Sequence, residues 1–159
     1  MRKSVLLFAM VFATVLSVSF SAFAGVVPAE YWAQSRVVMP NGAPVHEHFI
    51  KMKDGKMYVH INSFSGFSDV IAYNDFGGVD GKKTSVAELH QARNGEHVLI
   101  VVNKATGEVF VQTAAGDAPG LDAIIEDGNV YLPLRATAAI LGGKVDYDAG
   151  RDLAIVTQN

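Results

Sequence analysis

The 159-residue sequence contains no cysteine, and this absence excludes several classes of protein at once. Disulfide-stapled scaffolds, thiolate metal sites and enzymes with a cysteine nucleophile all require that side chain. Without cross-links, the fold must be stabilised by apolar burial and hydrogen bonding. Hydrophobic residues make up 50% of the sequence, which is enough for a real core even though an apolar N-terminus inflates the fraction.

Basic residues are too few for a protein that binds nucleic acid. The chain has 13 lysines and arginines against 16 aspartates and glutamates, a formal net charge of −3. Two of the basic residues, Arg2 and Lys3, belong to an N-terminal leader, so the rest of the chain is more acidic still. Binding to nucleic acid or to an anionic membrane depends on neutralising phosphates with cations, so neither partner is expected.

The first 24 residues have the pattern of a secretory signal peptide. The basic start is followed by an apolar run over 5–18, and small residues stand at Ala22 and Ala24. The apolar run is shorter than the ~20 residues that a membrane-spanning helix needs. We therefore expect cleavage between Ala24 and Gly25 and export of residues 25–159 as one domain, without a membrane span, to the periplasm, the cell wall or the medium.

Turn and helix signals punctuate the mature chain. Asn-Gly and Asp-Gly pairs are typical of tight hairpin turns or of helix ends. The segment from Ser85 to Glu88 fits a capping box, which predicts a helix over 86–93 ending at Asn94-Gly95. A second helix is predicted to begin at Pro133 and to end at a double glycine. Strands are expected at 36–39, 45–52, 56–61, 70–73, 97–103, 108–113, 129–132, 144–147 and 152–157.

One segment of the sequence has a weaker echo earlier in the chain. DGKMYVHINSF begins at Asp54, and DGNVYLPLRAT begins 73 positions later at Asp127. The alignment predicts two copies of a hairpin–helix–strand unit, at about 45–75 and 121–157. The first copy is degraded, because His60 stands where the second has proline and Asn62 where it has arginine. The alternative is two unrelated hairpins that share a common turn.

The C-terminal copy closely resembles the copper amine oxidase N-terminal-like domain, also called the stalk domain. The resemblance covers roughly the last 35 residues well and about 100 residues loosely. It implies a small α+β module, in which an antiparallel sheet curls against one or two short helices, found on exported bacterial proteins and generally without catalytic activity. It implies neither copper nor any other cofactor, because the metal and quinone of the amine oxidases belong to a separate, larger domain. The resemblance is carried by Asp127, Gly128, Tyr131, Pro133, Arg135, Gly142, Gly143, Tyr147 and Asp148.

The best candidate metal ligands are two histidines in the first half of the chain. His46 and His48 are two residues apart, so on a strand both imidazoles would share one face. His60 is a third candidate, across the following hairpin. The competing interpretation, which we favour, is a set of polar residues on an exposed strand face.

Other groups of polar and aromatic residues have bland explanations. Three tyrosines form either a carbohydrate-stacking platform or the edge of the core, and we favour the core edge. Three aspartates near the last hairpin form either a calcium site or turns paired with Arg135 or Arg151, and we favour the turns. Two further histidines are expected on the surface, and three serines lack the spacing of a hydrolase triad. The tyrosines are Tyr58, Tyr131 and Tyr147, and the aspartates are Asp146, Asp148 and Asp152. The histidines are His90 and His97, and the serines are Ser63, Ser65 and Ser68.

The sequence therefore predicts an exported, non-catalytic domain that binds or scaffolds at the bacterial cell envelope. Its expected partner is a cell-wall polymer or another envelope protein, reached through exposed sheet faces or loops. Two alternatives stay open at this point. One is a metal-binding protein or enzyme that uses His46 and His48, and the other is an envelope subunit that assembles with itself through exposed strand edges.

Overall fold

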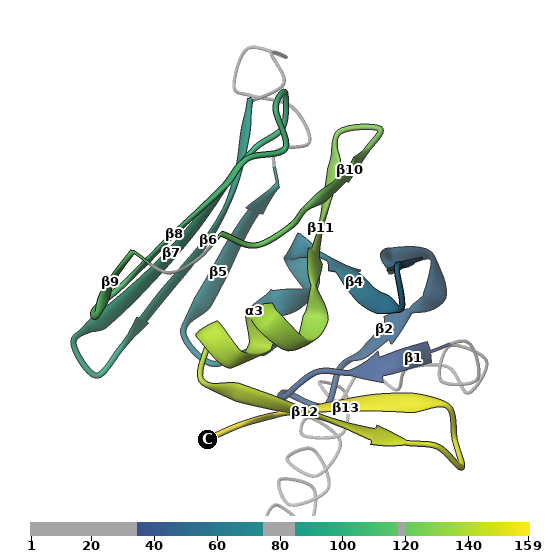
Figure 1. Ribbon diagram of the computed structural model, residues 1–159. Helices are drawn as coiled ribbons and strands as arrows, with labels where there is room; N and C mark the ends of the chain where they lie inside the picture. The colour runs from purple at the N-terminus through teal and green to yellow at the C-terminus, as the bar shows by residue number, and fades with distance from the viewer. Residues whose placement is uncertain (1–34, 75–84, 118–119) are drawn as a thin grey trace, which may run out of the picture. The chain divides into compact units, whose positions relative to one another are not determined.

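The computed structural model describes residues 35–74, 85–117 and 120–159 (Figure 1). These residues belong to one compact unit, Tyr31–Asn159. The predicted signal peptide and the residues up to 34 lie outside the described part. Within that part, no helix has the length and apolar character needed to cross a membrane.

The fold is mostly β, so the predicted α+β class is wrong. The described residues form thirteen strands in three sheets, with one α-helix and two short 3-10 turns. One predicted helix is absent because its residues pair as a strand. The small curled sheet that was expected is replaced by three separate sheets around a shared apolar core.

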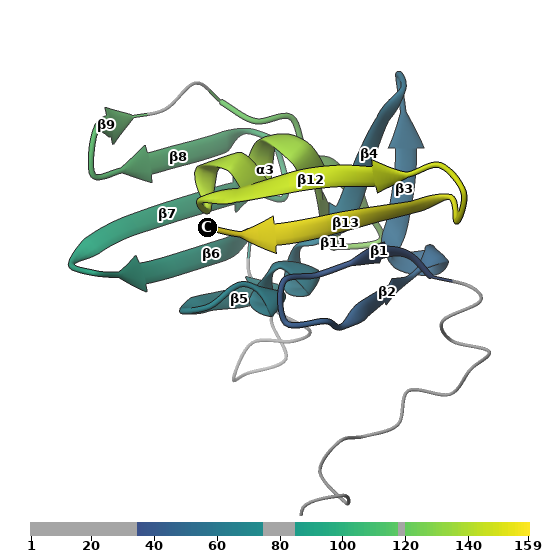
Figure 2. The ribbon, with the colours of Figure 1, turned by 90° about the horizontal axis from the view of Figure 1, so that it is seen from below.

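The first sheet brings together the two ends of the described chain. Its strand order is β12-β13-β1-β2, with β1 at Ser35–Val38, β2 at Pro44–His46, β12 at Gly143–Asp148 and β13 at Leu153–Gln158 (Figure 2). Strands β12 and β13 form a hairpin, and β1 pairs with β13 in parallel. Val37 lies opposite Ala154 in that parallel pair, and both are buried.

The second sheet is built from two hairpins with the same register. Its order is β10-β11-β4-β3, with β3 at Ile50–Lys53, β4 at Lys56–His60, β10 at Ile124–Glu126 and β11 at Asn129–Pro133. Lys51 pairs with Tyr58 in the first hairpin, and Ile124 pairs with Tyr131, 73 positions later, in the second. The central strands pair antiparallel around Val59 and Leu132, which are matched positions under the same offset.

The correspondence ends with the hairpins, so the predicted duplication of a hairpin–helix–strand unit is wrong. After β4 the chain forms a 3-10 turn, η2 at Ile61–Gly66, whereas after β11 it forms an α-helix, α3 at Leu134–Ile140. The strand that follows η2 joins the third sheet, and the strand that follows α3 joins the first. Gly66 contributes to this difference, because a Cβ there would lie 2.6 Å from the Met39 Cβ, so the turn is packed against the residue that follows β1.

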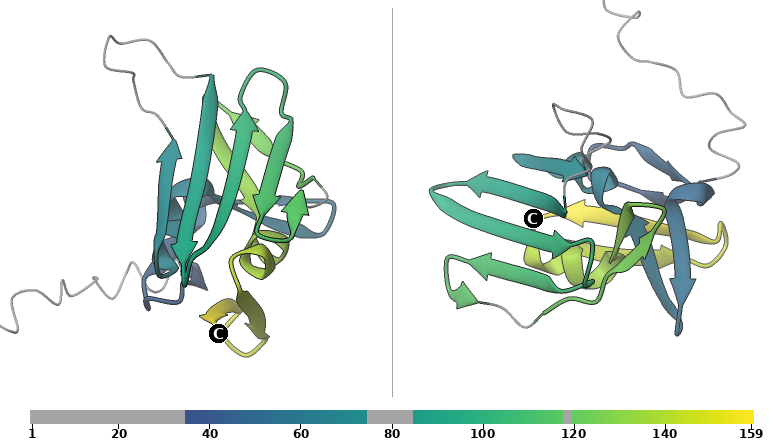
Figure 3. Two further views of the ribbon diagram at one scale, coloured as in Figure 1. Left: turned by 90° about the vertical axis from the view of Figure 1, so that its left-hand side faces the viewer. Right: turned by 90° about the horizontal axis from the view of Figure 1, so that it is seen from above.

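The third sheet contains the segment that was predicted to be a helix. Its order is β5-β6-β7-β8-β9, with β5 at Val70–Asn74, β6 at Val86–Arg93, β7 at Glu96–Asn103, β8 at Val109–Thr113 and β9 at Gly116–Asp117 (Figure 3). Strands β6 and β7 pair over their full length around Asn94-Gly95, a turn with positive φ at both residues. Burial in β6 alternates, with Ala87 and Leu89 inside. This period of two, matched by the strongly apolar β7, prevails over the local capping signal.

The predicted C-terminal helix is confirmed, and it contributes to the core. Pro133 precedes its first turn, and Leu134, Ala138 and Leu141 are buried as their spacing indicates. Gly142 has the left-handed φ of 73° that ends the helix. Gly143 has a different role: a Cβ there would lie 2.6 Å from the Phe67 ring, so it allows β12 and Phe67 to approach closely.

Candidate functional site

The segment that carries the candidate histidines is interrupted where one strand was expected. A 3-10 turn, η1 at Glu47–Phe49, separates β2 from β3. His46 is the last residue of β2, and His48 lies in the turn. The His46 ring accepts a hydrogen bond from the His48 backbone N–H through Nδ1, at 3.4 Å, which occupies one of the two nitrogens of that imidazole.

The three histidines form part of a ladder of aromatic rings. The centroids of His46 and His48 are 4.0 Å apart, and Phe49 lies 5.6 Å from His48 and 5.6 Å from His60. Tyr131 continues the ladder at 5.5 Å from His60, edge to face. Phe49 therefore stands between His60 and the other two histidines, so the ladder does not converge on one point.

Both ring nitrogens of His60 interact with protein groups. Nδ1 accepts from the Asn62 backbone N–H at 3.3 Å, and Nε2 lies 3.2 Å from the Asn74 amide nitrogen and 3.4 Å from the Asn129 amide oxygen. Burial lowers the pKa of His60 below its usual 6.5, since desolvation disfavours the charged ring. The side chain of Asn129 acts in the opposite direction and Lys104 adds to the lowering. His60 is thus a neutral, buried, hydrogen-bonded ring.

These contacts describe a packed polar cluster better than a metal centre. Among the residues that the structure describes, no group of three histidine or carboxylate side chains is placed to hold an ion. A zinc or copper site needs three or four ligands directed at one point. We therefore look elsewhere in the described residues for a binding surface.

A pocket of about 680 Å³ lies between the first hairpin of the second sheet, α3 and the last hairpin. This volume falls within the range of about 300–1,000 Å³ typical of small-ligand sites. The second half of the C-terminal motif contributes to it through Pro133, Arg135 and Tyr147. The apolar part of its wall is formed by Met52, Met57, Leu121, Leu134, Val145 and Tyr147.

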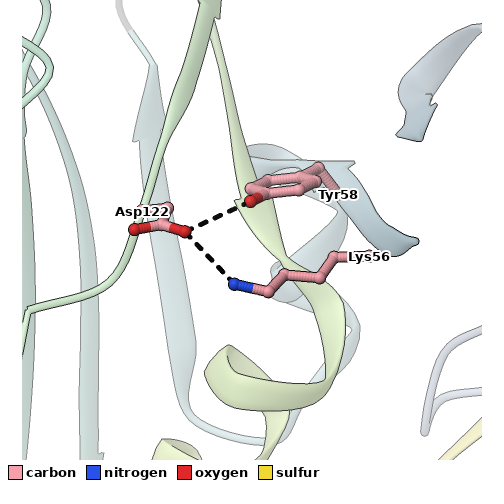
Figure 4. Close-up of polar contacts among 3 residues, drawn as sticks. All are labelled: Lys56, Tyr58 and Asp122. Carbon is pink, nitrogen blue, oxygen red and sulfur yellow. Dashed lines mark hydrogen bonds and ion pairs between the residues drawn. The ribbon is translucent and has the colours of Figure 1, made fainter. Parts of the chain in front are cut away.

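A charged triad stands at the pocket rim. One oxygen of the Asp122 carboxylate accepts from Lys56 Nζ and from the Tyr58 hydroxyl, both at 3.4 Å (Figure 4). The side chains of Lys56 and Asp122 are 61% and 67% exposed, so solvent screens their ion pair and it adds little to stability. Its effect is local and electrostatic, because the Asp122 carboxylate balances the positive charge of Lys56.

Arg135 has no such partner. It is exposed in the first turn of α3 and lines the pocket, and it forms no ion pair with any described carboxylate. The predicted pairing of one aspartate with Arg135 or Arg151 is made with Arg151, by Asp148. The pocket therefore carries one guanidinium whose charge is not balanced by the described residues around it.

A second exposed surface is the outward face of the five-stranded sheet, seen face-on in the left panel of Figure 3. Tyr73, Glu88, Val101 and Phe110 lie opposite one another across β5 to β8 and form one row. In this row Tyr73 is 55% exposed and Phe110 48% exposed. The neighbouring row consists of Ile71, His90, Leu99 and Gln112.

Comparisons with protein-family models, curated proteins and solved structures give no match. The two surfaces must therefore be interpreted from their own chemistry.

The other residues singled out from the sequence occupy ordinary positions. Tyr58 and Tyr131 are buried at 2% and 6% exposure, whereas Tyr147 is 56% exposed, so the three tyrosines do not share one open platform. The three aspartates pair separately: Asp146 with Lys144, Asp148 with Arg151, and Asp152 with Arg36 and the Tyr147 hydroxyl. His90 pairs with Glu88, and His97 is exposed beside the β6–β7 turn. The Ser65 hydroxyl donates to the Asn62 carbonyl.

Sequence reasoning missed Lys56 and Asp122 at the pocket and Tyr73 and Phe110 on the sheet. Lys56 and Asp122 are 66 residues apart, and no local pattern joins them. Tyr73 and Phe110 each alternate with inward residues, so a period-two pattern marks them as outward-facing. The pattern does not give the strand register, which is what places Tyr73 and Phe110 in one row.

Proposed function

We propose that this protein is an exported, non-catalytic binding domain of the bacterial cell envelope, and that its ligand is cell-wall polymer. The surface is the outward face of the five-stranded sheet. The observation that carries the proposal is the row from Tyr73 to Phe110, in which half-exposed aromatic rings flank Glu88 and Val101 on an open sheet.

Glycan chains have the chemistry that this face complements. A sugar ring has an apolar face that stacks on an aromatic ring and hydroxyl edges that take hydrogen bonds. Three strand spacings of about 4.8 Å separate Tyr73 from Phe110, a span of roughly 14 Å that suits an extended polymer. Between them, His90 Nε2 lies 2.9 Å from the Glu88 carboxylate, and both side chains face outward.

Two features of the sequence support a location at the envelope. The predicted leader directs the chain out of the cytoplasm. The C-terminal motif resembles the stalk domain, which occurs on exported bacterial proteins and is generally without catalytic activity. Both are predictions from sequence, and they support the location rather than the ligand.

Co-sedimentation of the exported, processed protein with insoluble peptidoglycan tests the proposal. We expect the native protein to pellet with the polymer and the Tyr73→Ala/Phe110→Ala variant to lose at least tenfold in retention, because stacking by two rings is removed. Tyr147→Ala is the matched control, since this ring is equally exposed but lies on another sheet. It should be retained like the native protein.

Two outcomes would contradict the proposal. One is a native protein that stays in the supernatant at every polymer concentration. The other is self-assembly through the exposed sheet face. In that case the native protein would not be retained on the polymer, and sedimentation velocity would show dimers that the Tyr73→Ala/Phe110→Ala variant does not form.

A further inference from the structure

We propose that the pocket beside α3 is a second binding site, which takes a small amphipathic carboxylate such as a medium-chain fatty acid. This inference is independent of the glycan proposal, because the pocket and the outward sheet face share no residues.

The pocket wall contains exposed apolar side chains that an apolar ligand would cover. Met52 is 64% exposed and Tyr147 56% exposed, the two largest values among the exposed large hydrophobic residues of the described part of the chain. Covering such side chains with an alkyl chain removes apolar surface from water, at about 25 cal/mol for each Å². The wall residues Met57, Leu121 and Val145 are only partly buried and extend the same surface inward.

The charge at the rim selects a carboxylate. Asp122 already neutralises Lys56, whereas Arg135 has no carboxylate partner among the described residues. A guanidinium binds a carboxylate through two parallel hydrogen bonds, which makes arginine the suitable residue for this group. A cationic ligand would meet the unbalanced charge of Arg135 and would be repelled.

The matched position in the other hairpin is filled by protein. Under the offset of 73 residues, Lys56 and Pro133 of the pocket correspond to Asn129 and His60 within the two hairpins. In that half, His60 bonds to Asn129 and to the backbone of Asn62, and Asn74 adds a further contact. Hydrogen-bonded side chains fill the space around His60, whereas the matched space around Pro133 is an open pocket with a largely apolar wall.

The shape of the ligand follows from the scarcity of polar wall groups. A peptide needs partners for its backbone N–H and C=O groups when it is buried. Apart from Lys56, Asp122 and Arg135, the Tyr147 hydroxyl and the backbone of Gly55 and Gly120, the wall consists of apolar side chains, which suit an alkyl chain better than a peptide.

Isothermal titration of the processed full-length protein with sodium decanoate, below its micellar concentration, tests the site. We expect one-to-one binding that Arg135→Gln weakens by roughly tenfold or more, the cost of one charge-assisted hydrogen bond. Arg151→Gln is the matched control, because Arg151 is exposed, pairs with Asp148 and does not line the pocket. Ala139→Leu, an exposed helix position facing the pocket, should weaken binding without unfolding the chain.

Three results would overturn the inference. The first is no binding of decanoate by a protein with a normal cooperative unfolding transition. The second is equal binding of decyltrimethylammonium, which has the same chain and the opposite charge. The third is tighter binding of acetyl-Ala-Ala-Leu than of decanoate, which would assign the pocket to a peptide terminus. Tyr147→Ala separates the two proposals, since it should weaken decanoate binding and leave polymer retention intact.

Discussion

At the scale of single residues, His60 connects the polar cluster to the pH dependence of stability. Its side chain is 3% exposed overall, and burial holds its pKa below the unfolded value of 6.5. In the window just below pH 6.5 the unfolded chain binds a proton that the folded chain does not. Stability from this group is therefore complete above pH 6.5 and is lost as the pH falls through the folded pKa.

We expect the free energy of unfolding to decrease between pH 7.5 and pH 5, and His60→Asn to reduce that slope because asparagine does not titrate. Denaturant unfolding at several pH values measures both. His90→Asn is the control, since His90 is an exposed ring on the sheet face. Parallel pH profiles for the native protein and His60→Asn would show that His60 is not the group responsible.

Individual residues were predicted well at turns whose backbone requires a positive φ. Asp54-Gly55 and Asp127-Gly128 both have positive φ, as tight hairpins require. The histidines were harder, because two residues of spacing place His46 and His48 on one face only if the strand is unbroken. The η1 turn breaks it, and no local signal marks that turn.

At the scale of elements, the segment from Ser85 to Arg93 shows how a local signal can be overruled. Ser85 and Glu88 match a capping box, yet β6 pairs with β5 on one side and with β7 on the other. Strand pairing on both edges, with Ala87 and Leu89 fully buried, contributes more than one cap. Eight of the nine predicted strands and the C-terminal helix are observed in the predicted order, whereas the ninth, over 45–52, is divided by η1. The sheet to which each strand belongs could not be derived from sequence, since register depends on distant partners.

Replacing Ser85 distinguishes a helix cap from a strand start. A serine that caps a helix loses about 1 kcal/mol on change to alanine. Here its backbone carbonyl accepts from the Lys104 N–H, a bond that alanine keeps. We expect Ser85→Ala to change the free energy of unfolding by less than about 0.5 kcal/mol, as for ordinary surface positions. A loss near the capping value in denaturant unfolding would contradict the strand.

At the scale of the whole molecule, the parallel pair of β1 and β13 ties one end of the described chain to the other. Terminal segments usually exchange their amides quickly because few contacts hold them. Strand β1 differs, since Val37 is fully buried and the strand lies between β13 and β2. The stability of the first sheet is thus shared by both ends of the chain.

Native-state hydrogen exchange should show this sharing directly. We expect the amides of β1 and β13 to be protected to the same extent, close to the protection of global unfolding. The short edge strand β9 serves as the internal control and should exchange much faster. Exchange of β1 at the rate of β9 would mean that the N-terminal strand frays independently.

The β1–β13 pair also bears on when the chain can finish folding. Strand β1 is synthesised early and its partner β13 late, so the first sheet cannot form completely until synthesis is nearly finished. Until β13 emerges, one edge of β1 is unpaired and the core lacks Ala154 and Val156. The connections of this sheet therefore delay completion of the fold until β13 has been made.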